Sequence, residues 1–135
     1  MQFVVDANII FSALIKDSTT RKLISEPKLS LYATKFFVEE FLGHLWELKE
    51  KINTDETHLK EKLNDFIMKN IKLITNEEIS EYIQEAEKIC PDKGDIAYFA
   101  LALKLNCAIW SNDSKLKNQS AIKIYSTKEI INLLN

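Results

Sequence analysis

The chain has 135 residues, of which 46% are hydrophobic and 28% are charged, and this size and balance predict one globular domain over residues 1–135. No stretch approaches the roughly 20 apolar residues of a membrane-spanning helix, and the first residues resemble a strand instead of a targeting segment, so we expect a cytoplasmic protein without a membrane partner. Cys90 and Cys107 lack a C-x-x-C spacing, which argues against a zinc site or a disulfide framework.

The charge of the chain excludes a strong attraction of the whole molecule to a polyanion, because the formal net charge is -2. A nucleic-acid partner would therefore be met by a local patch or through a metal ion. Arg21 is the only arginine in the sequence, so bidentate contacts to phosphate are scarce and lysines would supply the positive charge.

Short apolar runs alternate with helical patterns along the whole chain. The valine-rich run 2–5 is too short for a helix and is typical of a buried strand, whereas 35–52 repeats apolar residues at helical spacing. In chain order we predict a strand at 2–5, helices at 9–15 and 21–25, a strand at 29–33, helices at 35–52 and 55–69, a strand at 71–74, helices at 76–89 and 95–105, strands at 108–111 and 122–125, and a helix after Ser126. This alternation predicts an α/β fold with a mostly parallel sheet and helices on both faces.

Local capping patterns mark where several of these helices begin. Thr75 with Glu78, and Ser126 with Glu129, have the spacing of a capping box, in which each side chain satisfies the other's backbone N–H. Asn8 has the residue type and position to cap the first helix.

Two predicted strands end next to aspartates that lie more than 100 residues apart in the sequence, Asp6 and Asp113. Because ligands bind at the carboxyl ends of the strands in parallel α/β sheets, we expect these two side chains to share a site. Asp95 opens the buried helix before the second of these strands, so its carboxylate is predicted at the same edge. Clustered carboxylates repel one another unless a cation joins them, which favours a divalent-metal site.

A fourth acid is predicted from the helix that follows the second strand. The spacing of Glu40 from Phe36 and Phe37 places it toward the inner side of that helix, whereas the adjacent Glu39 points to solvent. An inward glutamate needs a partner, which lysines could provide.

Each of the three aspartates also has a purely structural interpretation. Asp6 is suited to a turn or to a helix cap, Asp95 to an N-cap, and Asp113 to the cap of a short turn. Asp92 has two readings as well, an outer metal ligand or a turn residue after Pro91, and the turn is favoured.

Four segments of the chain together resemble the PIN-domain nucleases, in the order and spacing of that family and over residues 4–113. They are Val4-Val5-Asp6-Ala7-Asn8, Glu40 on the helix after the second strand, Pro91-Asp92-Lys93-Gly94-Asp95 leading into the helix through Leu103, and Ile109-Trp110-Ser111-Asn112-Asp113. Each segment is a weak signal alone, and the combination is fairly specific.

The resemblance implies a three-layer α/β/α sandwich with a five-stranded parallel sheet, and an acidic cluster that binds Mg²⁺ or Mn²⁺ for phosphodiester hydrolysis, usually of RNA. By that resemblance the catalytic and metal-binding residues are Asp6, Glu40, Asp95 and Asp113, with Asn8 and Ser111 orienting the carboxylates. The chain departs from the family pattern at Asn112, where glycine is common, and at Thr34, where many relatives have proline. The second departure leaves Glu39 as an alternative to Glu40.

The favoured function is therefore a metal-dependent endoribonuclease that leaves 5′-phosphate and 3′-hydroxyl ends. A stand-alone chain of this size looks like the toxin of a VapC-type toxin–antitoxin pair, with an antitoxin protein as partner. Family members often pair, and the helices at 55–69 and 76–89 offer apolar residues for a homodimer.

Two alternatives stay open at this point. One is a catalytically inactive module that binds RNA or protein through the same fold. The other is a phosphatase with Asp6 as nucleophile, which is less favoured because that chemistry generally needs an acid two residues further on and Asn8 stands there.

Overall fold

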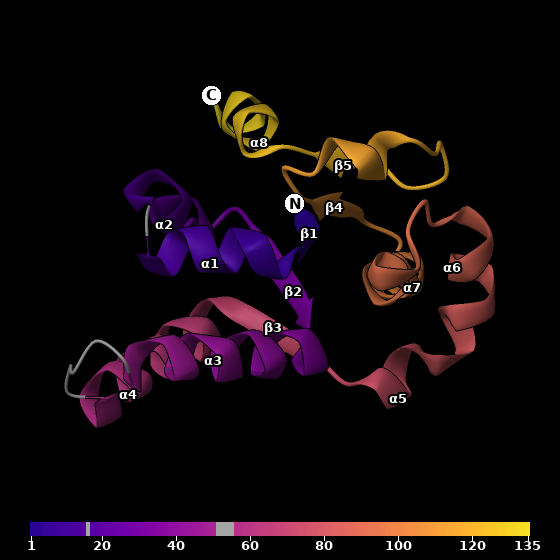
Figure 1. Cartoon of the computed structure of the whole chain (residues 1–135). Coiled ribbons are helices and arrows are strands. Elements are labelled where there is room, and N and C mark those ends of the chain that lie inside the picture. The colour runs from indigo at the N-terminus through magenta and orange to yellow at the C-terminus, as the bar shows by residue number, and fades with distance from the viewer. Residues whose placement is uncertain (16, 51–55) are drawn as a thin grey trace.

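A computed structural model of the chain describes residues 1–15, 17–50 and 56–135 (Figure 1). Its strands are β1 (Gln2–Val5), β2 (Ser30–Thr34), β3 (Ile71–Ile74), β4 (Ala108–Trp110) and β5 (Ile124–Tyr125). Its helices are α1 (Ala7–Ile15), α2 (Ser18–Ile24), α3 (Lys35–Glu50), α4 (Glu56–Asn70), α5 (Asn76–Ile79), α6 (Ile83–Ile89), α7 (Ile96–Leu105) and α8 (Thr127–Leu134), with short 3₁₀ turns η1 (Ser80–Tyr82), η2 (Lys93–Asp95) and η3 (Ser114–Lys117).

The strands form one five-stranded sheet in the order β3-β2-β1-β4-β5, and every neighbouring pair is parallel. β1 lies at the centre, where Val4 pairs with Tyr32 of β2 on one side and with Ile109 of β4 on the other. Since all five strands run in the same direction, all of their carboxyl ends meet at one edge of the sheet. The predicted parallel α/β sheet is confirmed.

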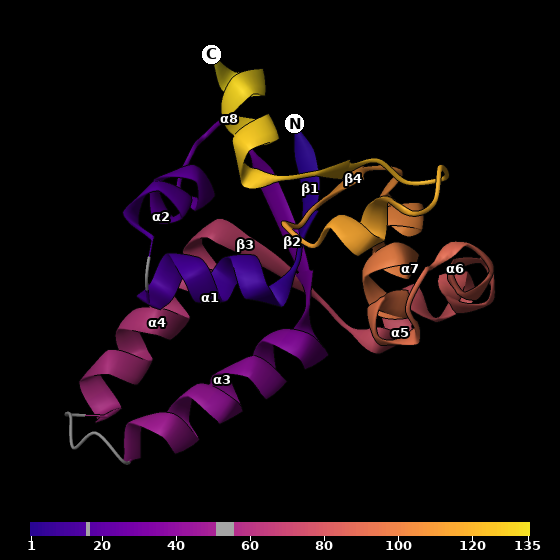
Figure 2. The ribbon, with the colours of Figure 1, turned by 45° about the horizontal axis from the view of Figure 1, so that its top comes forward.

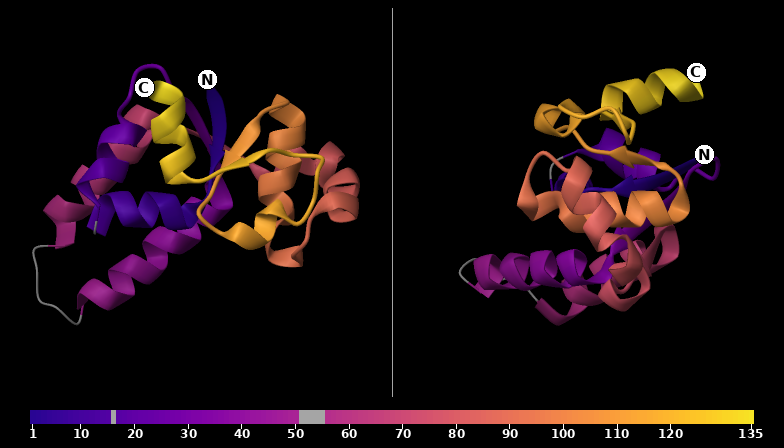
Figure 3. Two further views of the ribbon diagram at one scale, coloured as in Figure 1. Left: turned by 90° about the horizontal axis from the view of Figure 1, so that it is seen from above. Right: turned by 90° about the vertical axis from the view of Figure 1, so that its right-hand side faces the viewer.

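Successive residues of the central strand point to opposite faces and so belong to two different apolar clusters. Phe3 and Val5 pack in the cluster that includes residues of α1, α2 and α8, whereas Val4 packs in the cluster that includes residues of α5, α6 and α7. Figures 2 and 3 show α1 and α2 on one side of the strands and α6 and α7 on the other. The predicted three-layer sandwich is therefore confirmed.

Two helix starts differ from their predictions. Asn8 lies inside α1, which begins at Ala7, and the backbone carbonyl of Asp6 accepts hydrogen bonds from the N–H groups of the helix's first turn, so the prediction that Asn8 caps this helix is wrong. α2 begins at Ser18, and the carboxylate of Asp17 accepts from backbone N–H groups in its first turn. Both capping boxes, that of Thr75 and that of Ser126, are confirmed.

Other bounds shift because local patterns do not fix where an element ends. The helix predicted over 76–89 is interrupted by the 3₁₀ turn η1, which separates α5 from α6. The last residues of the helix predicted over 35–52 and the first residue of that predicted over 55–69 lie outside the described residues. No helix within the described part of the chain is long and apolar enough to cross a membrane.

Candidate functional site

The carboxylate of Asp6 links the carboxyl end of the central strand β1 to that of its neighbour β4. Asp6 follows β1 and is only 6% exposed. Its Oδ1 accepts a hydrogen bond from the backbone N–H of Asn8 at 2.8 Å, and its Oδ2 accepts one from the Ser111 hydroxyl at 2.7 Å. Ser111 follows β4, and its Oγ in turn accepts from the backbone N–H of Asp113 at 3.1 Å. The Ser111 hydroxyl therefore connects the carboxylate of Asp6 with the backbone of Asp113 in one hydrogen-bond network.

Asp6 and Asp113 also open onto the same space. A cavity of about 310 Å³ is lined by Asp6, Asn8, Ile9, Ser12, Asn112 and Asp113. Asp113 is exposed there, and its Oδ1 accepts from the backbone N–H of Lys115 at 3.0 Å, so it caps η3 as well as facing the cavity. A larger hollow of about 610 Å³ runs along β2, the end of α4 and β3, and none of the four predicted acids lines it.

Asp95 occupies the N-cap position of α7 without making a side-chain capping hydrogen bond. Burial, together with the negative charges of Asp6, Asp92 and Asp113, raises the pKa of its carboxyl to about 6. Asp95 therefore lies within electrostatic reach of three other acids. Asp92, by contrast, accepts from the backbone N–H of Gly94 at 2.9 Å, in keeping with its favoured turn role.

Glu40 and Glu39 are both exposed on α3, so the expectation that Glu40 turns inward is wrong. The two differ in their surroundings. Glu39 lies 3.9 Å from the ammonium of Lys35, one turn earlier on the same helix. The charge of Glu40 contributes to the environment of Tyr98, as described next, which places Glu40 at the outer margin of the acidic group.

Tyr98 on α7 is a member of this site that the sequence patterns did not single out. It is 5% exposed, its hydroxyl oxygen accepts a hydrogen bond from the backbone N–H of Ala7 at 3.2 Å, and its ring stacks on Phe37 of α3 with centroids 5.0 Å apart. Burial raises the pKa of the Tyr98 hydroxyl, and the charges of Asp6, Asp95 and Glu40 add to this effect. Its position one turn after Asp95 was the signal available in the sequence.

Asn112, which stands where the family pattern has glycine, connects the loop after β4 to the start of α8. Its side-chain oxygen accepts from the backbone N–H of Thr127 at 2.8 Å, and its side-chain nitrogen donates to the Thr127 hydroxyl at 3.1 Å. The indole N–H of Trp110 donates to the same hydroxyl at 3.0 Å. These contacts hold the loop that carries Asp113.

The side-chain atoms that could ligate a metal at this edge of the sheet suit a hard cation. All are oxygens, and Thr34 adds a fully buried hydroxyl with no hydrogen-bond partner among the described residues. Thr34 and Asp6 each lie two residues beyond the Val4–Tyr32 pair of β1 and β2. Across residues 1–15, 17–50 and 56–135 no three His, Cys, Asp or Glu side chains lie close enough together to ligate one ion. Mg²⁺ is commonly held by one or two carboxylates, with water and substrate oxygens completing the octahedron, and the pair facing the cavity meets that requirement.

Comparison with known proteins agrees with this architecture. The family model described as PIN domain matches residues 4–134. A chain in the crystal structure of VapBC2 from Rickettsia felis bound to a DNA fragment from their promoter is similar with a TM-score of 0.68 and 12% identity, over 93% of this chain and 98% of that one. The crystal structure of PAE2754 from Pyrobaculum aerophilum is similar with a TM-score of 0.62 and 14% identity, over 99% of this chain and 89% of that one. Comparison with curated protein sequences finds no match.

Proposed function

This chain belongs to the PIN domain family, and from that premise we propose that it is a metal-dependent endoribonuclease that hydrolyses phosphodiester bonds in RNA. The observation that carries the proposal is the convergence of separate acids on one edge of the sheet. Asp6 and Asp113 share a cavity, and both charges help to raise the pKa of Asp95 to about 6. A structural cluster would pair these charges with lysines, and none of these three acids has a lysine ion pair among the described residues.

Asp6 and Asp113, which face the cavity, would hold the metal, with Asp95 nearby and Glu40 at the outer margin for a second ion or for its bound water. When bound, Mg²⁺ or Mn²⁺ offsets the charge of the scissile phosphate and lowers the pKa of a water in its coordination shell. Asp6 is the best positioned of the four, because the Asn8 N–H and the Ser111 hydroxyl fix both of its oxygens. Carboxylates held in this way need no reorganisation when a ligand arrives.

Electrostatics makes a divalent cation necessary for this substrate. The edge of the sheet that carries the acids would repel an RNA phosphate, because the negative charges there already add to burial in raising the pKa of Asp95. A divalent cation bound by the acids makes the charge at this edge less negative and lets the RNA phosphate approach. The chain offers no arginine at the site that would do this instead, because Arg21 donates to the Ala13 carbonyl.

The nuclease proposal is tested with purified full-length chain, single-stranded RNA and added Mn²⁺. Cleavage should give 5′-phosphate and 3′-hydroxyl ends, stop in excess EDTA, and fall by more than about 100-fold in Asp6→Asn. Asp65→Asn, an exposed aspartate on α4, is the matched control and should cut like the wild type. Cleavage that persists in EDTA, or products with 2′,3′-cyclic phosphate, would contradict the proposed route.

We further propose that the chain is the toxin of a toxin–antitoxin pair and that it forms a homodimer. The similar fold of a chain in the VapBC2 structure supports the first part. Expression should then arrest growth, Asp6→Asn should remove the arrest, and light scattering should report twice the mass of one chain. Unimpaired growth with active enzyme would instead identify a nuclease without a toxin role. Mn²⁺ binding with no cleavage of any RNA would favour the catalytically inactive module.

A further inference from the structure

A second hollow next to the acids, which we call the aromatic groove, has no role in the chemistry described so far. Its volume is about 360 Å³. Most of its lining is apolar, and the side chains that matter here are Phe36, Phe37, Ile79, Ile83, Lys93 and Ile96. The residues come from α3, α5, α6, η2 and α7, so the groove is a product of the tertiary fold.

Three aromatic rings run from the open side of this groove to the acids. Phe36 is 52% exposed, although most large apolar side chains in the described residues are buried. Its ring meets Phe37 edge to face, with centroids 5.8 Å apart, and Phe37 stacks on Tyr98. Tyr98 is the residue whose hydroxyl accepts from the N–H that follows Asp6. A chain of ring contacts thus leads from the groove to the residue that contacts the segment next to Asp6.

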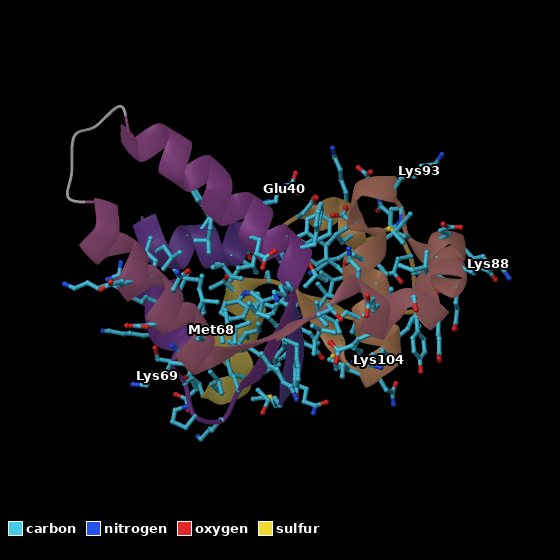
Figure 4. The ribbon with its side chains drawn as sticks, turned by 90° about the horizontal axis from the view of Figure 1, so that it is seen from below. Glu40, Met68, Lys69, Lys88, Lys93 and Lys104 are labelled. Atoms are coloured by element: carbon cyan, nitrogen blue, oxygen red, sulfur yellow. The ribbon has the colours of Figure 1, made fainter. Side chains whose placement is uncertain are left out.

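The groove and the acids share the same short segments of chain. Gly94 and Ile96, which flank Asp95, both line the groove. Glu40 lies one turn beyond Phe36 and Phe37 on α3. Figure 4 shows Glu40 along the same side of the molecule as Lys93, while Met68, Lys69 and Lys104 lie toward the opposite side of the view. Lys93, an exposed residue two positions before Asp95, also lines the groove.

We propose that the aromatic groove is a subsite for one unpaired nucleobase of the RNA, next to the phosphate that is cut. This inference rests on the proposed nuclease function and adds a substrate preference to it. The ring of Phe36 stacks on the base, and the apolar wall excludes water from its far side. Lys93 contacts the phosphate that flanks the base. Stacking on an aromatic side chain suits any base and requires that the base leave its helix.

The chemistry of the groove selects this occupant. A nucleobase has two apolar faces and a charged backbone beside it, which matches an exposed ring with one cation at the rim. A base inside a duplex is stacked and paired, so its faces are not available. The enzyme should therefore cut single-stranded RNA and leave the same sequence uncut in a duplex.

The first experiment measures cleavage of one single-stranded oligonucleotide by two variants at position 36 and one control variant. Phe36→Leu keeps an apolar side chain and removes the flat ring, so KM should rise about 5- to 150-fold while kcat changes little. Phe36→Trp should restore the wild-type KM. Met68→Ala, at an apolar side chain that is 70% exposed on α4, is the matched control and should leave KM unchanged. A KM in Phe36→Leu equal to that of the wild type overturns the proposal.

The second experiment removes the base instead of the ring. Oligonucleotides with a single abasic nucleotide at each position around the cut are compared in the wild type and in Phe36→Leu. One position should weaken cleavage by the wild type and have little further effect in the variant, because the two changes remove the same contact. If the effects of the abasic nucleotide and of Phe36→Leu are additive at every position, the proposal is overturned.

Two further measurements separate this inference from its competitors. If the wild type cuts no RNA, the nuclease function fails. The groove is then tested by measuring binding of the same oligonucleotide in the presence of Ca²⁺. Weaker binding by Phe36→Leu than by the wild type would support the nucleobase subsite. If light scattering shows that Phe36→Leu converts a dimer to a monomer, the groove is a contact between copies of the chain and the proposal is overturned.

Discussion

The amino ends of α7 and α8 each carry one acidic residue, Asp95 and Glu129, in opposite surroundings. The carboxylate of Glu129 accepts from the Ser126 backbone N–H and forms an ion pair with Lys117. The hydrogen bonds from Lys117 and from Ser126 together lower the pKa of Glu129 to about 2. Asp95 has no capping hydrogen bond, and burial with three acidic neighbours raises its pKa to about 6.

The contrast indicates that Glu129 stabilises the fold, whereas Asp95 is a candidate for a functional role. A negative charge at a helix amino end is favourable in both places because of the helix dipole. At α8 the local partners add to that effect. At α7 burial and repulsion oppose it, so the folded chain keeps Asp95 ionised at a cost in stability. Groups with pKa values perturbed by burial and like charge concentrate at functional sites.

The largest expected effect is on RNA cleavage. Asp95→Asn keeps the size of the side chain and removes its charge, so cleavage in Mn²⁺ should fall by more than about 100-fold. Glu129→Gln should cut at the wild-type rate, because this carboxylate belongs to the capping box of α8. Equal losses in the two variants would show that both act through the fold and would break the contrast.

The second expected effect is on the stability of the metal-free protein. The folded pKa of Asp95 lies above its model-peptide value, so between about pH 4 and pH 6 the folded state binds the proton more tightly and the free energy of unfolding falls as pH rises. Asp95→Asn should remove that slope and be more stable than the wild type by about 1 kcal/mol at pH 7, after allowance for solvent screening. Urea unfolding across this pH range measures it, and a less stable variant would contradict the assignment.

The smallest expected effect concerns Glu129. Its folded pKa of about 2 lies below the model value of 4.5, so its contribution to stability is complete above about pH 4.5 and is lost as pH falls toward 2. Glu129→Gln should therefore lower the melting temperature slightly at pH 7, and the difference from the wild type should shrink at low pH. The two acids would then give pH profiles of opposite slope. Thermal unfolding at a series of pH values provides the measurement.

Local patterns were sufficient for most of the fold. Both capping boxes depend on residues three positions apart, and the alternation of short apolar runs with helical stripes was enough to predict a parallel sheet. The positions of Asp6 and Asp113 at one edge followed from that sheet, because parallel strands carry their carboxyl ends to the same side. The predicted ends of the elements were less accurate, as the break at η1 between α5 and α6 shows.

The sequence by itself thus determined the order of strands and helices and the acids that end them, since spacing within a strand or helix is local information. Only the tertiary structure decided which acid has a hydrogen-bond or ion-pair partner and which residues surround each acid. Tyr98 reaches the N–H of Ala7 across 91 positions, and the residues that line the aromatic groove come from several elements far apart in the sequence. Contacts of this kind depend on how the helices pack against the sheet, and periodicity within one element carries no record of its neighbours.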